Sequence, residues 1–533
     1  MRHCWVYLSA ALFLWLSAVH VSAAEVLGEA QELTAQAVIE CTKNSAVLTD
    51  GDEKTYTKIA DGSSVVITSD TGISSLYIIF DRIYGQWTLS DGTTDAVCGE
   101  NGFLHEYVDT EKLFGYSPMS LTMTFSGHDC SLSEVHLFGD GKVPDWVQRW
   151  ETPCEEADLM LISTHVDDEQ LFFAGILPYY AGERDLAVQV VYFTDPYTYH
   201  DREHEQLNGL WTVGVRNYPV SGEFRDAYSE TAKDAYTHQR KYGYEREDMV
   251  LFQVEMIRRF RPHVVVGHDI NGEYGHGQHV INCETLMEAL DLAADPLYAP
   301  DSALVYGVWD TPKTYIHLWK ENPIVMDWDE PLETFGGRTA FQISQEGFLC
   351  HQSQQWTWFR RWIFGRNNEI TKASQIKKYS PCLYGLYRTN VGLDKEGGDM
   401  FENIPQSYAE IRAEEKRLQE ALAAEEEKRL QEALAAEEEK RLRETLASKE
   451  DDPSRVDGTE SIDSGQTGLR GMADDSEKGL DPGGPETDSI ESGSRKGFDT
   501  SVIAATATVA VLVALAVLYL LLRRRGRHGQ KKN

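Results

Sequence analysis

The stretch that decides the fold is short and apolar, and it ends in charged residues. Residues 159–169 read Leu-Met-Leu-Ile-Ser-Thr-His-Val-Asp-Asp-Glu. A short apolar run of this kind is typical of a buried parallel strand, and the polar residues directly after it lie at the carboxyl end of that strand. Open α/β sheets bind their ligands outside those ends. We therefore expect a parallel sheet with a site that begins at His165.

Two further apolar runs extend the pattern along the chain. Residues 187–193 (Ala-Val-Gln-Val-Val-Tyr-Phe) and 263–267 (His-Val-Val-Val-Gly) have the same character. Segments with helical spacing alternate with these strands, at 169–180, 203–211 and 248–260. This alternation predicts a Rossmann-like, doubly wound parallel α/β domain over residues 155–404.

Residues 40–140 follow a different pattern, in which short strands are separated by turn residues. Strands are expected at 64–68, 76–80 and 133–138. Period-2 alternation between turn signals is typical of an all-β sandwich. The sequence therefore predicts a β-sandwich domain ahead of the α/β domain.

Histidine and aspartate residues at two strand ends have the spacing of a metal site. His165 and Asp168 are three residues apart on a turn that enters a helix, so both side chains can reach one cation. A Gly-rich loop follows the third strand and contains His276 and His279, again three apart. Either motif alone is more often a solvated surface feature, but together on one α/β domain they indicate a site.

Two imidazoles, one carboxylate and an open position form a hydrolytic zinc site, although Fe²⁺ or another divalent ion has similar ligand preferences. Such an ion lowers the pKa of water, and a neighbouring unliganded carboxylate can then remove the proton. Asp167 is adjacent to the expected ligands in sequence. It is therefore the candidate general base.

These two motifs resemble those of a known family. Residues 165–169 (His-Val-Asp-Asp-Glu) look like the HPDDE motif of the PIG-L (LmbE-like) zinc deacetylases, and residues 274–279 (Tyr-Gly-His-Gly-Gln-His) look like their YGHPDH motif. Residues 201–205 resemble the R-x-x-E helix start of the same family. The resemblance spans residues 155–404 and implies a zinc-dependent N-deacetylase that acts on an N-acetylglucosamine-type sugar or a related amide.

The resemblance also implies a role for individual residues. It makes His165, Asp168 and His279 the zinc ligands and Asp167 the general base. The expected substrate contacts are His276 as oxyanion stabiliser or acid, Tyr274 as a second oxyanion donor, and Arg202 as a substrate-binding residue. For Arg202, a plain surface cation is an equally open alternative.

The sequence departs from the family motifs at two positions. Val166 replaces a proline, which alters loop rigidity, and Gln278 replaces an aspartate that commonly supports a neighbouring histidine. We expect the second change to lower the basicity of His276 or to fix a different tautomer of it. All the implied metal ligands are present.

The β-rich region resembles a discoidin-type (factor 5/8 type C) domain. The resemblance is carried by residues 48–52, 76–80 and 133–139. It implies a jelly-roll sandwich that binds glycans or lipid head groups, with Cys41 and Cys130 as a bracketing disulfide. A spacer sandwich without a ligand is the open alternative.

The two ends of the chain carry membrane signals. Residues 1–23 are expected to be a secretory signal peptide, and the uncharged residues 502–522 a transmembrane helix. The basic residues 523–533 place the tail in the cytoplasm by the positive-inside rule. The sequence thus predicts a single-pass protein of the cell membrane with an extracellular N-terminal part.

The segment between the α/β domain and the apolar run is highly charged. A twelve-residue repeat over 409–447 predicts a solitary helix rather than a coiled coil, because its leucines form no continuous stripe. Residues 448–499 are rich in Asp, Glu, Gly, Ser and Pro and are expected to be a disordered acidic stalk.

Composition narrows the choice of partners. The chain has 86 acidic and 50 basic residues and a formal charge of -36, which argues against nucleic-acid binding. The expected function is removal of acetyl groups from an N-acetylated glycan or glycoconjugate. A glycan-binding surface adhesin with a weakly active or inactive deacetylase domain is the main alternative, and an amidase for a thiol-sugar conjugate is another. The sequence leaves the oligomeric state open.

Overall fold

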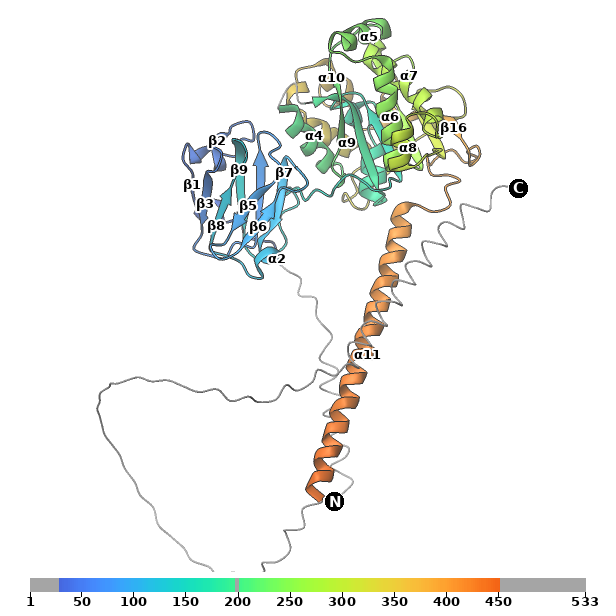
Figure 1. Ribbon diagram of the computed structural model, residues 1–533. Coiled ribbons are helices and arrows are strands. Elements are labelled where there is room, and N and C mark those ends of the chain that lie inside the picture. The colour runs from blue at the N-terminus through green and yellow to red at the C-terminus, as the bar shows by residue number, and fades with distance from the viewer. Residues whose placement is uncertain (1–27, 197–200, 451–533) are drawn as a thin grey trace, which may run out of the picture. The chain divides into compact units, whose positions relative to one another are not determined.

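The computed structural model describes residues 28–196 and 201–450 (Figure 1). The predicted signal peptide at 1–23, transmembrane helix at 502–522 and tail at 523–533 lie outside these residues, as does nearly all of the predicted stalk. Within the described ranges, no helix combines the length and the apolar character that a membrane crossing needs.

A seven-stranded sheet forms the centre of the second half of the described chain. Its order is β12-β11-β10-β13-β14-β16-β15. The strands are β10 (Leu159–Ser163), β11 (Val188–Asp195), β12 (Val220–Arg225), β13 (Val264–Gly267), β14 (Lys313–His317), β15 (Pro323–Val325) and β16 (Leu383–Thr389). The first five strands of this order, from β12 through β14, pair in parallel with their neighbours. The chain proceeds from β10 to β11 and β12 on one side and then returns to β13 on the other side of β10. The carboxyl ends of β10 and β13 therefore meet at a topological switch point.

The sheet differs from the prediction at one edge. β16 pairs antiparallel with both β14 and β15, so the sheet is mixed rather than wholly parallel. An antiparallel edge on a doubly wound sheet is common. The mixed α/β class is confirmed.

Alternating side chains of β10 explain why helices cover both faces. Leu159 and Leu161 enter one apolar cluster, together with residues of α4 (Asp201–Thr212) and α9 (Ala340–Cys350). Met160 and Ile162 enter a second cluster with α6 (Arg246–Phe260) and α7 (Gly277–Leu292). Figure 1 shows these helices packed around the central strands.

The helix predicted over 169–180 is interrupted. The structure has a short α3 (Asp168–Leu171) and a π-helical turn, η3 (Pro178–Glu183), in its place. Gly175 lies between them with a φ of +101°. The remaining helices are α5 (Ala232–Lys241), η5 (Glu273–Gly275), α8 (Pro300–Tyr306), η6 (Gln352–Gln354), α10 (Trp358–Phe364) and η7 (Ala373–Gln375).

The first half of the described chain is a β-sandwich of two antiparallel sheets. One sheet has the order β1-β3-β8-β5-β6 and the other β2-β9-β4-β7. The strands are β1 (Val38–Glu40), β2 (Thr57–Ile59), β3 (Ser64–Thr68), β4 (Ser75–Phe80), β5 (Trp87–Ser90), β6 (Asp95–Cys98), β7 (His105–Asp109), β8 (Ser120–Thr124) and β9 (Cys130–Phe138). The short helices are η1 (Thr34–Gln36), η2 (Ser45–Thr49) and α2 (Thr110–Phe114).

The disulfide implied by the discoidin resemblance is absent from this sandwich. All seven cysteines of the described residues are free thiols. The Cys41 thiol donates to the carbonyl oxygen of Lys43 at 3.2 Å, whereas Cys130 is fully buried on β9. The sandwich is therefore held by its apolar core rather than by a covalent bracket.

Helix α11 (Tyr408–Glu450) contains the charged repeat. The leucines of α11 up to Leu442 are exposed, at 52% for Leu418 and 62% for Leu442. The Arg429 guanidinium lies 2.6 Å from a Glu425 carboxylate oxygen one turn earlier. Ion pairs at this spacing stabilise an isolated helix by a few tenths of a kcal/mol each.

Substitution of Gly175 tests how tightly the chain packs between α3 and η3. A Cβ at this position would lie 2.3 Å from the Cγ atom of Trp328, and the positive φ adds backbone strain. We expect Gly175→Ala to lower the free energy of unfolding by about 2–4 kcal/mol. Gly243→Ala is the matched control, because Gly243 has a φ of +91° but no atom within 4 Å of the added methyl group. Urea denaturation that showed equal losses for both variants would contradict this packing argument.

Candidate active site

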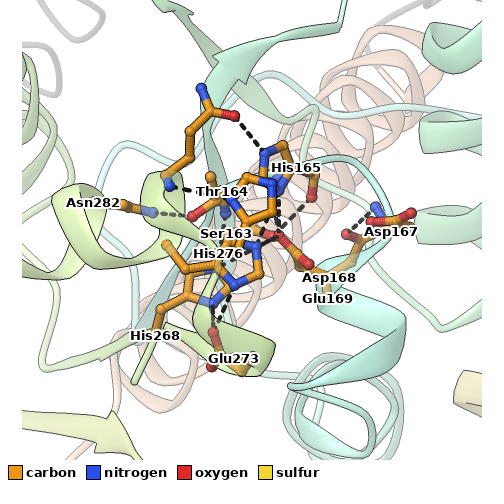
Figure 2. A network of polar contacts seen from close by, with 12 residues as sticks. Ser163, Thr164, His165, Asp167, Asp168, Glu169, His268, Glu273, His276 and Asn282 are labelled. Carbon is orange, nitrogen blue, oxygen red and sulfur yellow. Dashed lines mark hydrogen bonds and ion pairs between the residues drawn. The ribbon is translucent and has the colours of Figure 1, made fainter. Parts of the chain in front are cut away.

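The motif after β10 and the loop after β13 meet in space, and three of their polar atoms form a nearly equilateral triangle. The Nδ1 atom of His165 lies 3.1 Å from an Asp168 oxygen and 3.1 Å from Nε2 of His279. The same Asp168 oxygen lies 3.2 Å from His279 Nε2. Figure 2 shows His165 and Asp168 in this network. The three residues are almost completely buried.

Gln278 determines which nitrogen of His165 carries hydrogen. Its side-chain nitrogen donates to the Arg225 carbonyl oxygen at 2.6 Å, and its oxygen accepts from the Ala227 amide at 3.1 Å. This fixes the amide orientation, so the Gln278 oxygen faces His165 Nε2 at 2.9 Å as an acceptor. His165 Nε2 must carry the hydrogen, and Nδ1 presents a lone pair to the triangle.

Glu273 determines which nitrogen of His279 carries hydrogen, as Gln278 does for His165. Its Oε2 atom accepts from Nδ1 of His279 at 2.7 Å and from Nδ1 of His268 at 2.8 Å. Its Oε1 atom lies 2.6 Å from Nδ1 of His317 and accepts from the Asp269 amide at 3.1 Å. Burial alone would raise the pKa of Glu273, but the surrounding histidines outweigh it and hold the pKa well below its usual range.

When both imidazoles are neutral, the triangle therefore consists of two nitrogen lone pairs and one anionic oxygen. Burial opposes ionisation of Asp168, yet His279 and His165 hold the pKa of this carboxyl well below its usual range. Burial likewise opposes protonation of His279, but Asp168 and Glu273 raise its pKa to about 10. A proton therefore occupies Nε2 of His279 unless a cation takes its place. Electron-rich atoms this close repel one another unless a proton or a cation lies among them.

The donor set fits a divalent cation. Donors around a tetrahedral zinc ion lie roughly 3.3 Å apart, close to the separations of 3.1–3.2 Å between these atoms. The wider surroundings also include groupings of His276 with His165 and His279, and of His268 with Asp168 and His279. His268 is less suited as a ligand, because its Nε2 already accepts from the Thr164 amide at 2.9 Å.

His276 lies beside the triangle with one nitrogen engaged. Its Nδ1 accepts from the Gln278 amide at 3.1 Å, which leaves the hydrogen on Nε2. Burial and the nearby His165 and His279 lower the pKa of His276, so it is neutral. Its ring packs 4.8 Å from that of His165. The outcome differs from our expectation for Gln278, whose side chain supports His165 rather than His276.

Asp167 faces a different environment from its neighbour Asp168. A φ of 132° places it in a sparsely populated region, as often occurs at functional sites. Burial raises the pKa of Asp167 to about 7, although the guanidinium of Arg202 lies 3.5 Å from its carboxylate and lowers it. The Asp167 amide donates to a Glu169 oxygen at 2.9 Å, which holds the turn. Arg202 is thus a partner of Asp167 with a side chain only 12% exposed, and not a surface cation.

Tyr274 belongs to an aromatic group next to the histidines. Its ring lies 5.4 Å from that of His276 and 5.5 Å from that of His279. Trp358, from α10, contacts the other side of the Tyr274 ring at 5.4 Å, and Tyr228 contacts His276 at 5.2 Å. The exposed fractions of Tyr228 and Trp358 are 66% and 46%, so aromatic surface lines the outer side of the site.

All seven predicted site residues lie in or beside this network, but the sequence interpretation missed three others. Glu273, His268 and His317 orient the ligands without occupying the predicted motif positions. A glutamate three residues before His276 was the available signal. His317 lies at the end of β14, and only the sheet order brings it to Glu273.

Comparisons with known proteins identify similar deacetylases. No protein-family model matches the chain. It is 31% identical over 187 residues to 1D-myo-inositol 2-acetamido-2-deoxy-alpha-D-glucopyranoside deacetylase 2 of Saccharopolyspora erythraea, covering 35% of this chain and 58% of that protein. It is 26% identical over 211 residues to the corresponding deacetylase 1 of Catenulispora acidiphila, covering 36% of this chain and 64% of that protein. The chain therefore spans about three fifths of the length of these curated relatives.

Among solved structures, N,N'-diacetylchitobiose deacetylase from Pyrococcus horikoshii is similar at 15% identity, with a TM-score of 0.31 over 45% of this chain and 86% of that one. The relatives by sequence are named as deacetylases of an acetamido sugar. They support the resemblance to PIG-L-type deacetylases. The discoidin-type resemblance of the sandwich is not confirmed and stays a prediction.

Glu273 is the residue of this network whose replacement is most informative. We expect Glu273→Gln to weaken divalent-metal binding by about 10- to 100-fold, because the amide cannot accept from His268 and His279 as the carboxylate does. Competition with a chromophoric chelator measures the affinity. Glu288→Gln, on the outer side of α7 beside Arg246, is the control and should bind metal as the unmodified chain does. Unchanged affinity in Glu273→Gln would exclude this orienting role.

Proposed function

We propose that this chain is a divalent-metal-dependent hydrolase that removes the acetyl group from an N-acetylglucosamine-type sugar or a related amide. The observation that carries the proposal is the triangle of His165 Nδ1, Asp168 and His279 Nε2, with separations of 3.1–3.2 Å. Two imidazoles and one carboxylate suit zinc best, with Fe²⁺ as another candidate. When bound there, such an ion polarises a carbonyl group and lowers the pKa of water.

Asp167 is suited to remove the proton of the attacking water. A general base works best with a pKa near the working pH, and the pKa of Asp167 is raised by burial to about 7. The Arg202 guanidinium, 3.5 Å away, stabilises the ionised form that accepts the proton. The protonated carboxyl can then donate to the departing amine, so the proton is returned and the residue is regenerated.

In this proposal, His276 and Tyr274 stabilise the oxygen that becomes negative during attack on the acetyl carbonyl. His276 is neutral and carries its hydrogen on Nε2, so it can donate a hydrogen bond but is a poor proton source. Burial also raises the pKa of Tyr274 and keeps its hydroxyl protonated as a donor. These states favour the oxyanion role for His276 over the role of general acid.

The choice of a sugar substrate is supported by the aromatic surface and by the relatives. Tyr228 and Trp358 are partly exposed beside His276 and Tyr274. Flat aromatic rings offer rigid apolar contact area of the kind that can pack against a sugar ring. The relatives named above act on an acetamido sugar. The acetyl group would then face the triangle while the ring contacts the aromatic side chains.

We also propose that this activity is exposed on the outer face of a membrane. The proposal rests on sequence signals alone, the signal-like residues 1–23 and the apolar residues 502–522. The acidic stretch and the solitary helix α11 would separate the catalytic part from the bilayer.

The general-base role predicts a selective loss. We expect Asp167→Asn to reduce acetate release by about 10²- to 10⁴-fold, since the amide cannot take up the proton. Metal content should stay at the unmodified level, because Asp167 is not one of the three triangle residues. Asp301→Asn, exposed at the start of α8, is the control and should remain active. Full activity in Asp167→Asn would remove this residue from the mechanism.

Metal dependence is tested on the purified chain with a panel of N-acetylated saccharides. Treatment with a chelator should abolish acetate release, and Zn²⁺ or Fe²⁺ should restore it. Hydrolysis that persists after complete metal removal would contradict the proposal. Failure to hydrolyse any panel member in the metal-loaded form would instead favour the glycan-binding adhesin.

A further inference from the structure

A second group of metal-binding side chains lies where the β-sandwich contacts the α/β domain. His105 is the first residue of β7, Glu53 precedes β2, and His204 is on α4. One ligand atom of each lies within 4.8 Å of those of the other two. None of these residues belongs to the triangle or to the aromatic side chains described above, so this group is separate from the candidate active site.

The two imidazoles of this group face each other directly. Nε2 of His105 lies 2.8 Å from Nδ1 of His204, and both side chains are almost completely buried. The Tyr77 hydroxyl lies 2.9 Å from the other nitrogen of His105. Ligating histidines usually have such an outer hydrogen-bond partner, which fixes the ring orientation. Two facing nitrogens at this distance share either one hydrogen or one cation.

The electrostatics of the group favour a cation. Nε2 of His105 and Nδ1 of His204 point at each other, and Glu53 is the only one of the three residues that carries a carboxylate. Glu53 accepts from the Asn208 amide at 2.9 Å and is partly buried. No ion pair to Glu53 is found in the part of the chain that the structure describes, and the neighbouring Lys54 pairs with Asp201 instead. A bound cation would supply a positive charge beside this partly buried carboxylate.

We propose that Glu53, His105 and His204 bind a second divalent cation, of the zinc class, that links the sandwich to the α/β domain. Two imidazoles and one carboxylate are a typical donor set for such an ion, with water in the remaining position. Donors around zinc lie roughly 3.3 Å apart. The two imidazole nitrogens lie 2.8 Å apart and the Glu53 oxygen lies within 4.8 Å of both, so small side-chain movements would bring the three donors to this spacing.

This position gives the ion a structural consequence. Two hydrogen bonds near this group also join the sandwich to the α/β domain. The Leu104 amide donates to the Tyr218 hydroxyl at 3.1 Å, and the Asn208 amide donates to Glu53. A cation held by residues from both parts binds only when they are docked, so its binding free energy adds to the stability of the docked form. Removal of the ion should therefore loosen the contact between the two parts without disturbing the triangle.

The test is the metal stoichiometry of the full-length chain loaded with Zn²⁺ and freed of excess metal. Mass spectrometry of metal content should find two equivalents in the unmodified chain, one in His204→Gln and one in Glu53→Gln. Glu53→Gln guards against misfolding, because the amide is the same size and can still accept from Asn208. His128→Gln, an exposed histidine of the same sandwich, is the control and should keep two equivalents.

A variant of the catalytic triangle separates the two sites. His279→Gln should also retain one equivalent, and combining it with His204→Gln should leave none. The melting temperature of the His279→Gln chain should rise on addition of Zn²⁺, and that rise should vanish in the double variant. One equivalent in the unmodified chain, or two in both His204→Gln and Glu53→Gln, would overturn the proposal and assign the shared hydrogen to the His105–His204 pair.

Discussion

The buried carboxylate of Glu273 is the interaction on which the rest of the site depends. It accepts from His268, His279 and the Asp269 amide and pairs with His317, whose Nε2 in turn donates to the Ser380 carbonyl oxygen. These groups come from the ends of β13 and β14 and from α7. One anion thus joins two strands and a helix, and it points the lone pair of His279 at Asp168.

The switch point explains why the two motifs converge. β10 pairs with β11 on one side and β13 on the other, so the loops after β10 and β13 leave the sheet side by side. The sequence predicted these strands because each is a compact apolar run, and it predicted the convergence of His165 and His279 because polar residues follow both. The local sequence pattern and the geometry of parallel sheets were therefore sufficient to predict these strands and the meeting of the two motifs.

Other features depend on contacts that no local pattern encodes. The strand β16 starts at Leu383, far along the chain from β14, so its antiparallel pairing follows from tertiary packing. The helix predicted from residue 169 onward breaks at Gly175, where Trp328 occupies the space that a side chain would need. Glu273 looked like an ordinary loop residue, because the histidines that define its role lie on separate elements.

Gln278 shows how the site keeps its geometry after losing a charge. A carboxylate at this position would orient His165 and also stabilise its protonated form. The amide oxygen still accepts from His165 Nε2, and its donation to the Arg225 carbonyl prevents the amide from flipping. It is neutral, however, so it does less to favour an imidazolium at His165. A charge still reaches this nitrogen from Asp226, whose carboxylate lies 3.6 Å from Nε2 of His165. Burial opposes protonation of His165, but Asp226 and Asp168 together raise its pKa. A cation at Nδ1 therefore displaces a proton from this atom.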